Sequence, residues 1–263
     1  MFDLIDISEE TVKCMEDGFY IHDGKKIPLD IPKCREVKVY DPEWNEKSVR
    51  MERSYDTVFS VTSDDTTSAI LKEKESERTA VLNFASAMHP GGGFLTGARA
   101  QEEAISRVST LYYSIASKKG YVMYQENRKR GGRFYLEYML FSPHVEFFRT
   151  SDFSFLPKPV VTSVLTVPAP NRNRFSLSET ELDEVLSKRI ERMLSMALDN
   201  GKKNLILGAW GCGVFGNDPY QIASAFKNAL TTTFDRAFSR VTFAVLPSRR
   251  DNNYEVFKEV FGA

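Results

Sequence analysis

Short apolar runs and longer amphipathic stretches alternate along the chain from about residue 79 onward. The runs "TAVLNFA", "VVTSVLTV" and "NLILGA" are typical of short buried strands. The longest amphipathic stretch, "SLSETELDEVLSKRIERMLSMALDNG", predicts a helix in which Ser178 and Glu181 have the spacing of a capping box and Gly201 follows the end. This alternation predicts an α/β fold with helices on both faces of a largely parallel sheet.

Further elements follow from the same pattern. We expect a helix over 104–116, and a second helix over "DPYQIASAFKNALTTTF", with Asp218 as its N-cap. "RVTFAVL" and "NNYEVFKEVF" predict a closing strand and helix. "EYMLFSPHVEFFR" predicts an extended segment broken at Pro143, and the basic stretch at 125–134 predicts a surface loop.

The first 75 residues do not form this pattern. "SEETVKCMEDG" predicts a short helix opened by Ser8, and "GFYIHDGKKIPL" predicts a hairpin. "CREVKVYD" alternates like a strand, and "VTSDDTTSAILKEKES" predicts a loop and then a helix capped by Asp65 or Thr66. We therefore expect two parts, an N-terminal extension (1–75) packed on the core and a core domain (76–263).

Charge and cysteine usage narrow the class of protein. The formal net charge of the 263 residues is −1, so no global basic field favours DNA, and direct DNA binding is not expected. The three cysteines are widely spaced, which suggests a reducing, cytoplasmic compartment. Cysteines and histidines show no zinc-ligand spacing, so no metal is expected. The sequence has no apolar run of membrane-spanning length, and no membrane association is expected.

Two glycine-rich loops follow predicted strands. The first, "HPGGGFLTGARAQEE", holds three consecutive glycines, Gly91, Gly92 and Gly93. The second, "GAWGCGVFGNDP", precedes a predicted helix. Either loop alone could be a tight strand-to-helix connection. Because ligands of such sheets bind beyond the carboxyl ends of strands, and amides ahead of a helix favour anions, we expect the two loops to share one phosphate-binding site.

Gln101, Glu102 and Glu103 stand at the start of the helix predicted over 104–116. Acidic residues are common in a first helical turn because they suit the helix dipole, and that is the structural interpretation. Neighbouring helical residues point about 100° apart, so the two carboxylates cannot share one role. Beside a triple glycine, one glutamate would hold substrate hydroxyls while the other exchanges a proton.

The residues of the first loop carry a family resemblance. "GGGFLTGARAQEE" resembles the GGG…QEE signature of poly(ADP-ribose) glycohydrolases, and the longer stretch from "VLNFAS" to "VSTLY" is similar to the microbial branch. The resemblance continues through "FSPHVEFFR", "SVLTVPAPN" and the second loop, and so covers nearly the whole chain. It implies a macrodomain-like fold, a three-layer α/β/α sandwich around a mixed sheet.

The resemblance also implies residue roles. Glu103 matches the catalytic glutamate, and Glu102 matches the partner that orients ribose hydroxyls. Gly91, Gly92 and Gly93 match residues around the distal ribose and phosphates. The expected substrate site also includes Gln101. The expected diphosphate loop consists of Gly211, Cys212, Gly213, Val214, Phe215 and Gly216. The segment expected near the adenine consists of Asp65 and Thr66. Asn83 is either a strand residue that bonds locally or a ribose contact, and Cys212 is an inert thiol whose backbone N–H matters.

The implied chemistry is hydrolysis of the ribose–ribose bond of poly(ADP-ribose), with ADP-ribose as product. Glu103 would act as general acid and then as base at an oxocarbenium-like transition state, and no cofactor is needed. Two alternatives stay open. The protein could hydrolyse mono-ADP-ribose from an ADP-ribosylated protein, for example from arginine, or it could be a non-catalytic reader of ADP-ribose.

Overall fold

A seven-stranded mixed sheet forms the centre of the computed structural model, which describes residues 3–173 and 178–262. In spatial order its strands are β3 (Lys38–Tyr40), β6 (Met139–Arg149), β7 (Phe155–Pro168), β5 (Thr79–Ala85), β8 (Asn204–Leu207), β9 (Arg240–Ala244) and β4 (Val58–Thr62). The five strands from β7 to β4 run parallel, and β6 is antiparallel to both of its neighbours. The predicted α/β class with a mixed sheet is confirmed.

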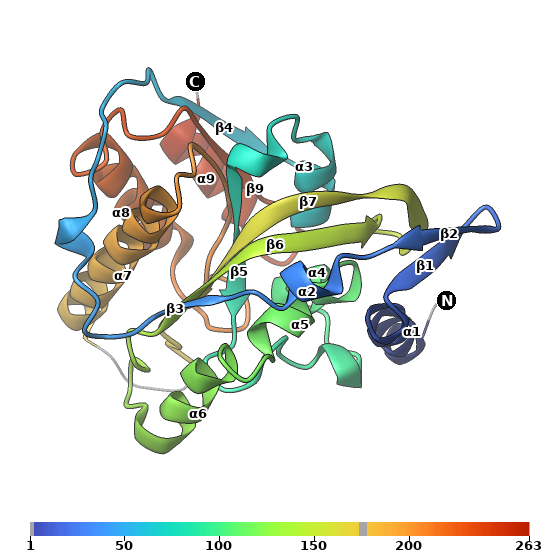
Figure 1. Cartoon of the computed structure of the whole chain (residues 1–263). Coiled ribbons are helices and arrows are strands. Elements are labelled where there is room, and N and C mark those ends of the chain that lie inside the picture. Colours follow the sequence, from blue (N-terminus) through green and yellow to red (C-terminus); the bar gives the residue numbers. More distant parts are fainter. Residues whose placement is uncertain (1–2, 174–177, 263) are drawn as a thin grey trace.

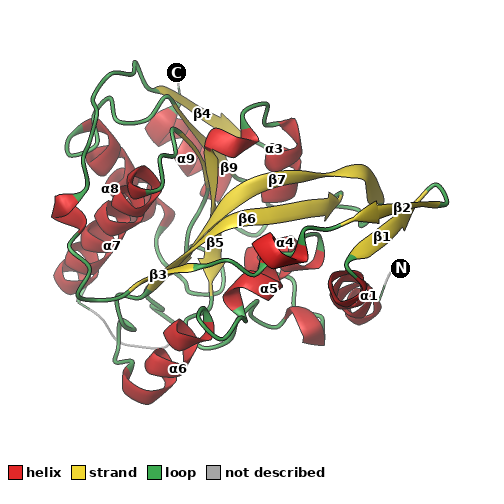
Figure 2. Ribbon diagram, in the orientation of Figure 1, coloured by secondary structure: helices red, strands yellow, loops and turns green. Residues whose placement is uncertain are grey.

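Helices cover both faces of the sheet (Figures 1 and 2). One face packs against α7 (Glu179–Asp199), α8 (Pro219–Thr231) and α9 (Asn253–Phe261), and the other against α3 (Thr66–Lys72), α4 (Gln101–Arg107), α5 (Leu111–Ile115) and α6 (Tyr121–Arg130). Strand β5 shows why: Ala80 and Leu82 join the first core, whereas Val81 joins the second. Because side chains alternate across a strand, its largely apolar sequence buries both faces.

The N-terminal helix and hairpin lie beside the sheet. Helix α1 (Leu4–Asp17) is followed by the strands β1 (Phe19–His22) and β2 (Lys25–Pro28) and by α2 (Ile31–Cys34). The predicted hairpin is confirmed. The predicted helix start at Ser8 is wrong, because the Asp3 carboxylate caps the helix by accepting a hydrogen bond from the backbone N–H of Ile5 at 2.8 Å.

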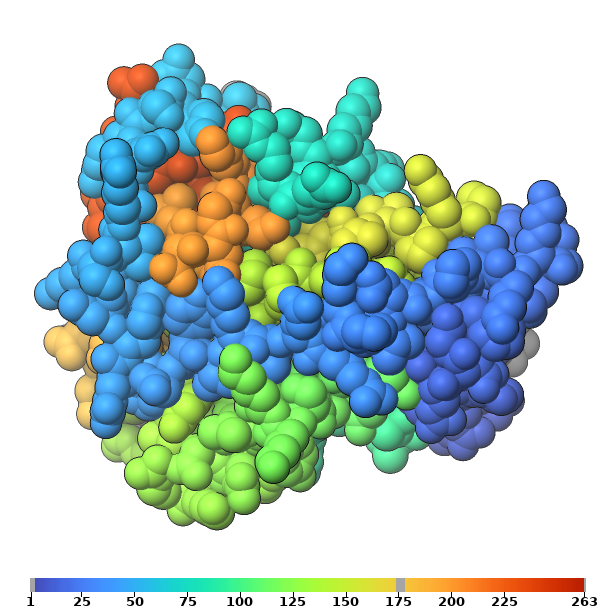
Figure 3. Space-filling view, viewed as in Figure 1, coloured from blue at the N-terminus to red at the C-terminus, as the bar shows by residue number. Residues whose placement is uncertain are grey.

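The sheet runs across the sequence boundary that we placed at residue 75. Strand β4, which the sequence analysis missed, pairs in parallel with β9 at one edge, and β3 forms the other edge. The chain between them, residues 41–57, runs along one side of the molecule, at the left in lighter blue in Figure 3. The division into an extension and a core domain stays a prediction about folding units, but the first 75 residues supply both edge strands of the sheet.

Three predicted elements differ from the structure. The helix expected over 104–116 is two helices, because the backbone between them pairs with β6: Thr110 N–H donates to the Glu146 carbonyl at 3.0 Å and Ser109 bridges Phe147. The basic stretch at 125–134 is largely helix α6, whose Met123 packs in the core. The segment with Pro143 is one continuous strand that tolerates proline at a register shift.

The caps of the other long helices agree with the sequence. The capping box of α7 and the Asp218 cap of α8 are both present, and Asp65 rather than Thr66 caps α3. The first two residues of the predicted long helix, Ser176 and Leu177, lie outside the described residues. Three short 3₁₀ helices complete the chain: Glu46–Ser48, Ser76–Arg78 and Phe94–Thr96. Within the described ranges, no helix is long and apolar enough to cross a membrane.

Candidate active site

A cleft of about 1030 Å³ opens at the carboxyl ends of the five parallel strands. The loops that follow β4, β5, β7, β8 and β9 each contribute to its lining, with Asp65, Ser86, Ala169, Gly211 and Leu246 respectively. In parallel sheets this edge gathers loops and helix N-termini from several strands, which is why ligands bind there. The cleft therefore lies where the two glycine loops were expected to meet.

Glu102 lies at the bottom of this cleft and is only 2% exposed. Its Oε1 accepts a hydrogen bond from Asn83 Nδ2 at 3.2 Å, and its Oε2 accepts one from the Ser86 N–H at 2.7 Å. Burial is the main cause that raises the pKa of Glu102 to about 8, and the neighbouring Glu103 charge raises it further. The hydrogen bonds from Ser86 and Asn83 act in the opposite direction and lower this pKa. Near neutral pH, Glu102 therefore keeps its proton in most molecules.

Glu103 faces the first glycine loop. Its Oε1 accepts a hydrogen bond from the Gly93 N–H at 2.9 Å, which fixes the carboxyl group. Its Oε2 is buried and has no hydrogen-bond partner among the described residues. A buried oxygen without a partner costs free energy unless a ligand or water completes it. The second oxygen of Glu103 is therefore available to a reacting group in the cleft.

The backbone amides of the first loop hold these two carboxyl groups. Gly91 N–H donates to the Glu102 carboxylate, Gly92 N–H donates to the His89 carbonyl at 3.0 Å, and Gly93 N–H donates to Glu103. Gly92 has a φ of 57°, and a Cβ there would lie 2.2 Å from Glu103 Oε1. Glycine is thus required at this position because the catalytic candidate approaches the backbone itself.

Helix α1 supports the first loop from behind. The buried Arg107 guanidinium donates to the carbonyls of Phe94 and Ala98 at 2.9 and 2.6 Å, and to Ser8 Oγ at 3.1 Å. The Ser8 hydroxyl in turn donates to the Phe94 carbonyl at 2.7 Å. These bonds satisfy loop carbonyls that would otherwise be buried without a donor, and they fix the loop against the start of the chain.

The second loop, 211–216, presents its amides instead. No group of the described residues accepts a hydrogen bond from the N–H groups of Gly213, Val214 and Phe215. Two asparagines hold the loop from outside: Asn173 Nδ2 donates to the Val214 carbonyl at 3.0 Å, and Asn217 Nδ2 donates to the Gly211 carbonyl at 3.2 Å. Free amides just before the first turn of α8 form a site for an anion.

Comparison with known proteins agrees with this geometry. A family model described as microbial-type PARG, catalytic domain, matches residues 8–150, which is more than half of the chain. The chain belongs to the microbial-type poly(ADP-ribose) glycohydrolase family. A search of curated proteins found no match.

Solved structures of the family are close in fold. The poly(ADP-ribose) glycohydrolase of Thermomonospora curvata is 33% identical with a TM-score of 0.91, over 98% of this chain and 99% of that one. The same enzyme bound to the inhibitor ADP-HPD gives 32% identity and a TM-score of 0.86 over the same shares. The enzyme of Deinococcus radiodurans in complex with ADP-ribose is 38% identical with a TM-score of 0.80, over 87% of this chain and 95% of that one.

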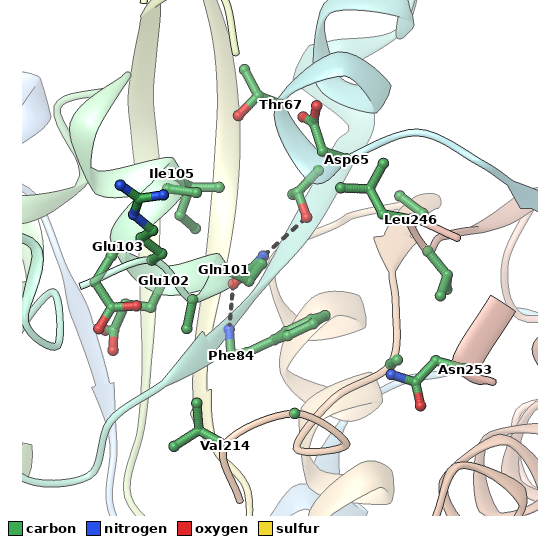
Figure 4. Close-up of a pocket in the computed structure, with 18 of the residues that line it drawn as sticks. Asp65, Thr67, Phe84, Gln101, Glu102, Glu103, Ile105, Val214, Leu246 and Asn253 are labelled. Carbon is green, nitrogen blue, oxygen red and sulfur yellow. Dashed lines mark hydrogen bonds between the residues drawn. The ribbon is translucent and has the colours of Figure 1, made fainter. Parts of the chain in front are cut away.

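Most of the predicted site residues of this family member line the cleft, and Figure 4 shows several of them. They are Asp65, Thr66, Gln101, Glu102, Glu103, Gly211, Gly213, Val214 and Phe215. The remaining predicted residues are not part of the lining: Gly91, Gly92, Gly93, Cys212 and Gly216. Gln101 has a structural role, because its amide donates to Thr66 Oγ1 and the Leu82 carbonyl and accepts from the Phe84 N–H.

Sequence reasoning missed part of the lining. The loop after β9 contributes Leu246, Ser248, Arg250 and Asp251, and the turn between β6 and β7 contributes Ser151. The first group had a signal, since it follows a predicted parallel strand, as both glycine loops do. The turn between antiparallel strands had none. Asn83 is a strand residue, as expected, and its side-chain amide donates to Thr166 of the paired strand at 3.3 Å; its bond to Glu102 was not foreseen.

One group of potential metal ligands lies outside the cleft. Cys34, His144 and Glu146 place a sulfur, a ring nitrogen and a carboxylate oxygen within 4.8 Å of one another. Cys34 is more than 100 residues from His144 and Glu146, so ligand spacing gave no sign of the group, and none of the three lines the cleft.

Proposed function

We propose that this protein hydrolyses the ribose–ribose O-glycosidic bonds of poly(ADP-ribose) and releases ADP-ribose, with Glu103 as general acid and base. The observation that carries the proposal is the buried, unpartnered Oε2 of Glu103 in the cleft, held in place by the Gly93 amide. The relatives described above, one bound to ADP-ribose and one to ADP-HPD, support this choice of substrate.

The second glycine loop is the natural place for the substrate diphosphate. The three free N–H groups of Gly213, Val214 and Phe215 precede α8, where the partial positive charge of the helix favours an anion. Gly213 leaves room for the ligand, because a Cβ at this position would meet no atom within 4 Å. In this proposal the second loop binds the substrate diphosphate and takes no part in proton transfer.

Glu102 positions the ribose in this proposal. Its pKa of about 8 keeps the carboxyl largely neutral at neutral pH, so it can donate a hydrogen bond to a ribose hydroxyl. Asn83 and the Ser86 amide hold Glu102 in one orientation.

Glu103 then carries the proton transfers. As an acid, Glu103 Oε2 gives its proton to the departing 2′-oxygen while the bond from that oxygen to the anomeric carbon breaks. Positive charge develops on the ring oxygen and anomeric carbon, and the substrate diphosphate stabilises it. The ionised Glu103 next takes a proton from a water molecule, whose oxygen bonds to the anomeric carbon. Glu103 ends protonated, and water has been consumed.

The deciding experiment compares two substrates. Purified wild-type protein is incubated with poly(ADP-ribose) and, separately, with protein carrying arginine-linked mono-ADP-ribose, and the released products are resolved by chromatography. We expect ADP-ribose from the polymer. Release from the mono-linked substrate alone would replace the proposal with a mono-ADP-ribosyl hydrolase, and binding of ADP-ribose without cleavage of either substrate would indicate a reader.

The partners proposed here follow from that reaction: poly(ADP-ribose) or ADP-ribosylated protein as substrate, with no direct contact to DNA. We also propose a cytoplasmic location. Its support is that the cysteines Cys14, Cys34 and Cys212 are free thiols, as a reducing compartment would keep them. Fractionation of cells expressing the protein tests this, and recovery from an oxidising compartment would contradict it.

A further inference from the structure

Cys34, His144 and Glu146 form a compact cluster where α2 meets the central sheet. Cys34 ends α2, whereas His144 and Glu146 both lie on β6 and point the same way, with His144 Nε2 3.1 Å from Glu146 Oε1. The three ligand atoms lie within 4.8 Å of one another. We propose that these residues bind one zinc ion that clamps α2 to strand β6.

The set of donor atoms suits zinc. Thiolate sulfur, imidazole nitrogen and carboxylate oxygen are the three ligand types that zinc takes, with bonds of roughly 2.0–2.3 Å. Such bonds hold neighbouring ligand atoms roughly 3.3–3.8 Å apart in a tetrahedron. The histidine–glutamate separation of 3.1 Å is close to that range, and side-chain shifts of about 1 Å bring the sulfur within it. A thiolate and a carboxylate also neutralise the two positive charges of the ion.

Neighbouring groups already orient the proposed ligands. The backbone N–H of Asp30 donates to both carboxylate oxygens of Glu146, at 3.3 and 3.2 Å. The Thr110 hydroxyl hydrogen-bonds the Cys34 sulfur, and its oxygen accepts a bond from the Glu146 N–H at 3.0 Å. Hydrogen bonds of this kind fix the direction of ligand lone pairs in metal sites.

The cluster combines burial with access to solvent. Cys34 is fully buried and Glu146 is nearly so, but the His144 side chain is 21% exposed. An ion can therefore enter past His144, and a water molecule can fill the fourth position. Nearby charges do not repel the ion, because Lys33 pairs with Asp30 at 2.8 Å. Without an ion, burial and the Glu146 carboxylate raise the pKa of Cys34 to about 12, and a bound cation favours the thiolate instead.

The proposed ion has a structural role. None of its three ligands lines the cleft, and the cluster joins a segment near residue 34 to a strand more than 100 residues later. Because such a site exists only in the folded chain, the ion stabilises the fold by the free energy of binding. The reaction proposed for Glu103 does not use it, so its test does not depend on activity.

Zinc content and melting temperature test the proposal. The protein is stripped with chelator, incubated with one equivalent of zinc, desalted and analysed for metal. We expect about one zinc per chain in the wild type, and at least a tenfold loss of affinity in Cys34→Ser and in His144→Asn. Adding zinc should raise the melting temperature of the wild type but not of these two variants. Cys14→Ser is the matched control, because Cys14 is also buried but lies near Arg149 and outside the cluster.

Cobalt gives a direct view of the ligands. Substituted for zinc, it should show a thiolate charge-transfer band that is present in Cys14→Ser and absent in Cys34→Ser. Since His144 is partly exposed, we expect His144→Asn to fold without metal, and a melting curve of this variant checks that it does. Failure of the wild type to retain zinc, or unchanged retention in a folded His144→Asn protein, would overturn the proposal.

Discussion

The two glycine loops near the catalytic candidates are both rich in glycine but use their backbones in opposite ways. In the first, 91–93, the amides donate inward, to Glu102, Glu103 and the His89 carbonyl. In the second, 211–216, three successive amides donate to no group of the residues that the structure describes. The first loop therefore fixes the reacting carboxyl groups, whereas the second remains open for a ligand.

The reason for glycine differs accordingly. Gly92 is needed because a side chain would collide with Glu103, 2.2 Å from its Oε1. Gly213 meets nothing within 4 Å, so the protein itself does not require glycine there. Gly213 instead leaves space beside the free amides, where the proposed ligand would lie, and this contrast separates chemistry from binding in the proposed site.

The largest effect is expected from Gly92→Ala. The new Cβ would displace the Glu103 carboxyl group, and the φ of 57° adds strain. Hydrolysis of poly(ADP-ribose) should fall by at least about 100-fold, the scale for losing a positioned acid or base, while ADP-ribose affinity changes by less than about tenfold. Rate measurements and calorimetry check this. Gly132→Ala is the control, because a Cβ at Gly132, unlike one at Gly92, would meet nothing within 4 Å. Equal losses of rate and affinity would erase the contrast between the loops.

Gly213→Val should have the converse effect. The side chain projects from the loop that carries the free amides, so affinity for ADP-ribose should weaken by more than about tenfold, or about 1.4 kcal/mol. The protein should melt like the wild type, because the new Cβ would meet no atom within 4 Å. Gly132→Val is the matched control. Unchanged affinity would remove the second loop from the site.

Glu102→Gln should alter the pH dependence of stability. The folded protein holds the Glu102 proton up to pH about 8, whereas the unfolded chain releases it near the ordinary value of 4.5. The proton's contribution to stability is thus complete below about pH 4.5 and is lost as the pH rises through about 8. Urea unfolding at several pH values should show that Glu102→Gln lacks this loss. Parallel pH profiles for both proteins would contradict the shifted pKa.

The smallest effect is expected from Cys212→Ser. Burial holds the pKa of this thiol well above its usual range, and its sulfur lies 3.8 Å from the Trp210 carbonyl. It is therefore not a nucleophile, and the backbone of the second loop should be unaffected. We expect rate and affinity within about threefold of the wild type, an effect of about 0.5 kcal/mol. A tenfold loss of rate in a folded protein would assign chemistry to the second loop.

Sequence predicted the parts of the fold that local pattern determines. Buried parallel strands such as β5 and β8 are mostly apolar, and α7 and α8 carry their own caps. Strand β4 was missed because its five residues lie among polar neighbours and are defined by pairing with β9. The break between α4 and α5 depends on bonds to β6, some 36 residues away along the chain. Neither is visible in a local window.

The same limit applies to the site. Glu102, Glu103 and the glycines lie within a short motif, so the motif was enough to find them. The contacts that hold them come from elsewhere: Arg107 reaches Ser8, 99 residues away, and Asn83 reaches Glu102 across the sheet edge. The proposed zinc ligands, Cys34 and His144, are likewise brought together only by the fold. Spacing along the chain cannot reveal such pairs.

Glu103→Gln is the sharpest test of the proposal that Glu103 is the general acid and base, because it removes the proton-transfer group while keeping its shape. Release of ADP-ribose from poly(ADP-ribose) and calorimetric affinity for ADP-ribose are measured on the same preparation, with thermal melting to verify folding. We expect ADP-ribose release from the polymer to be slower by a factor of roughly 10²–10⁴, and the affinity for ADP-ribose to change by less than about tenfold. A folded Glu103→Gln protein that cleaves the polymer at the wild-type rate would contradict it.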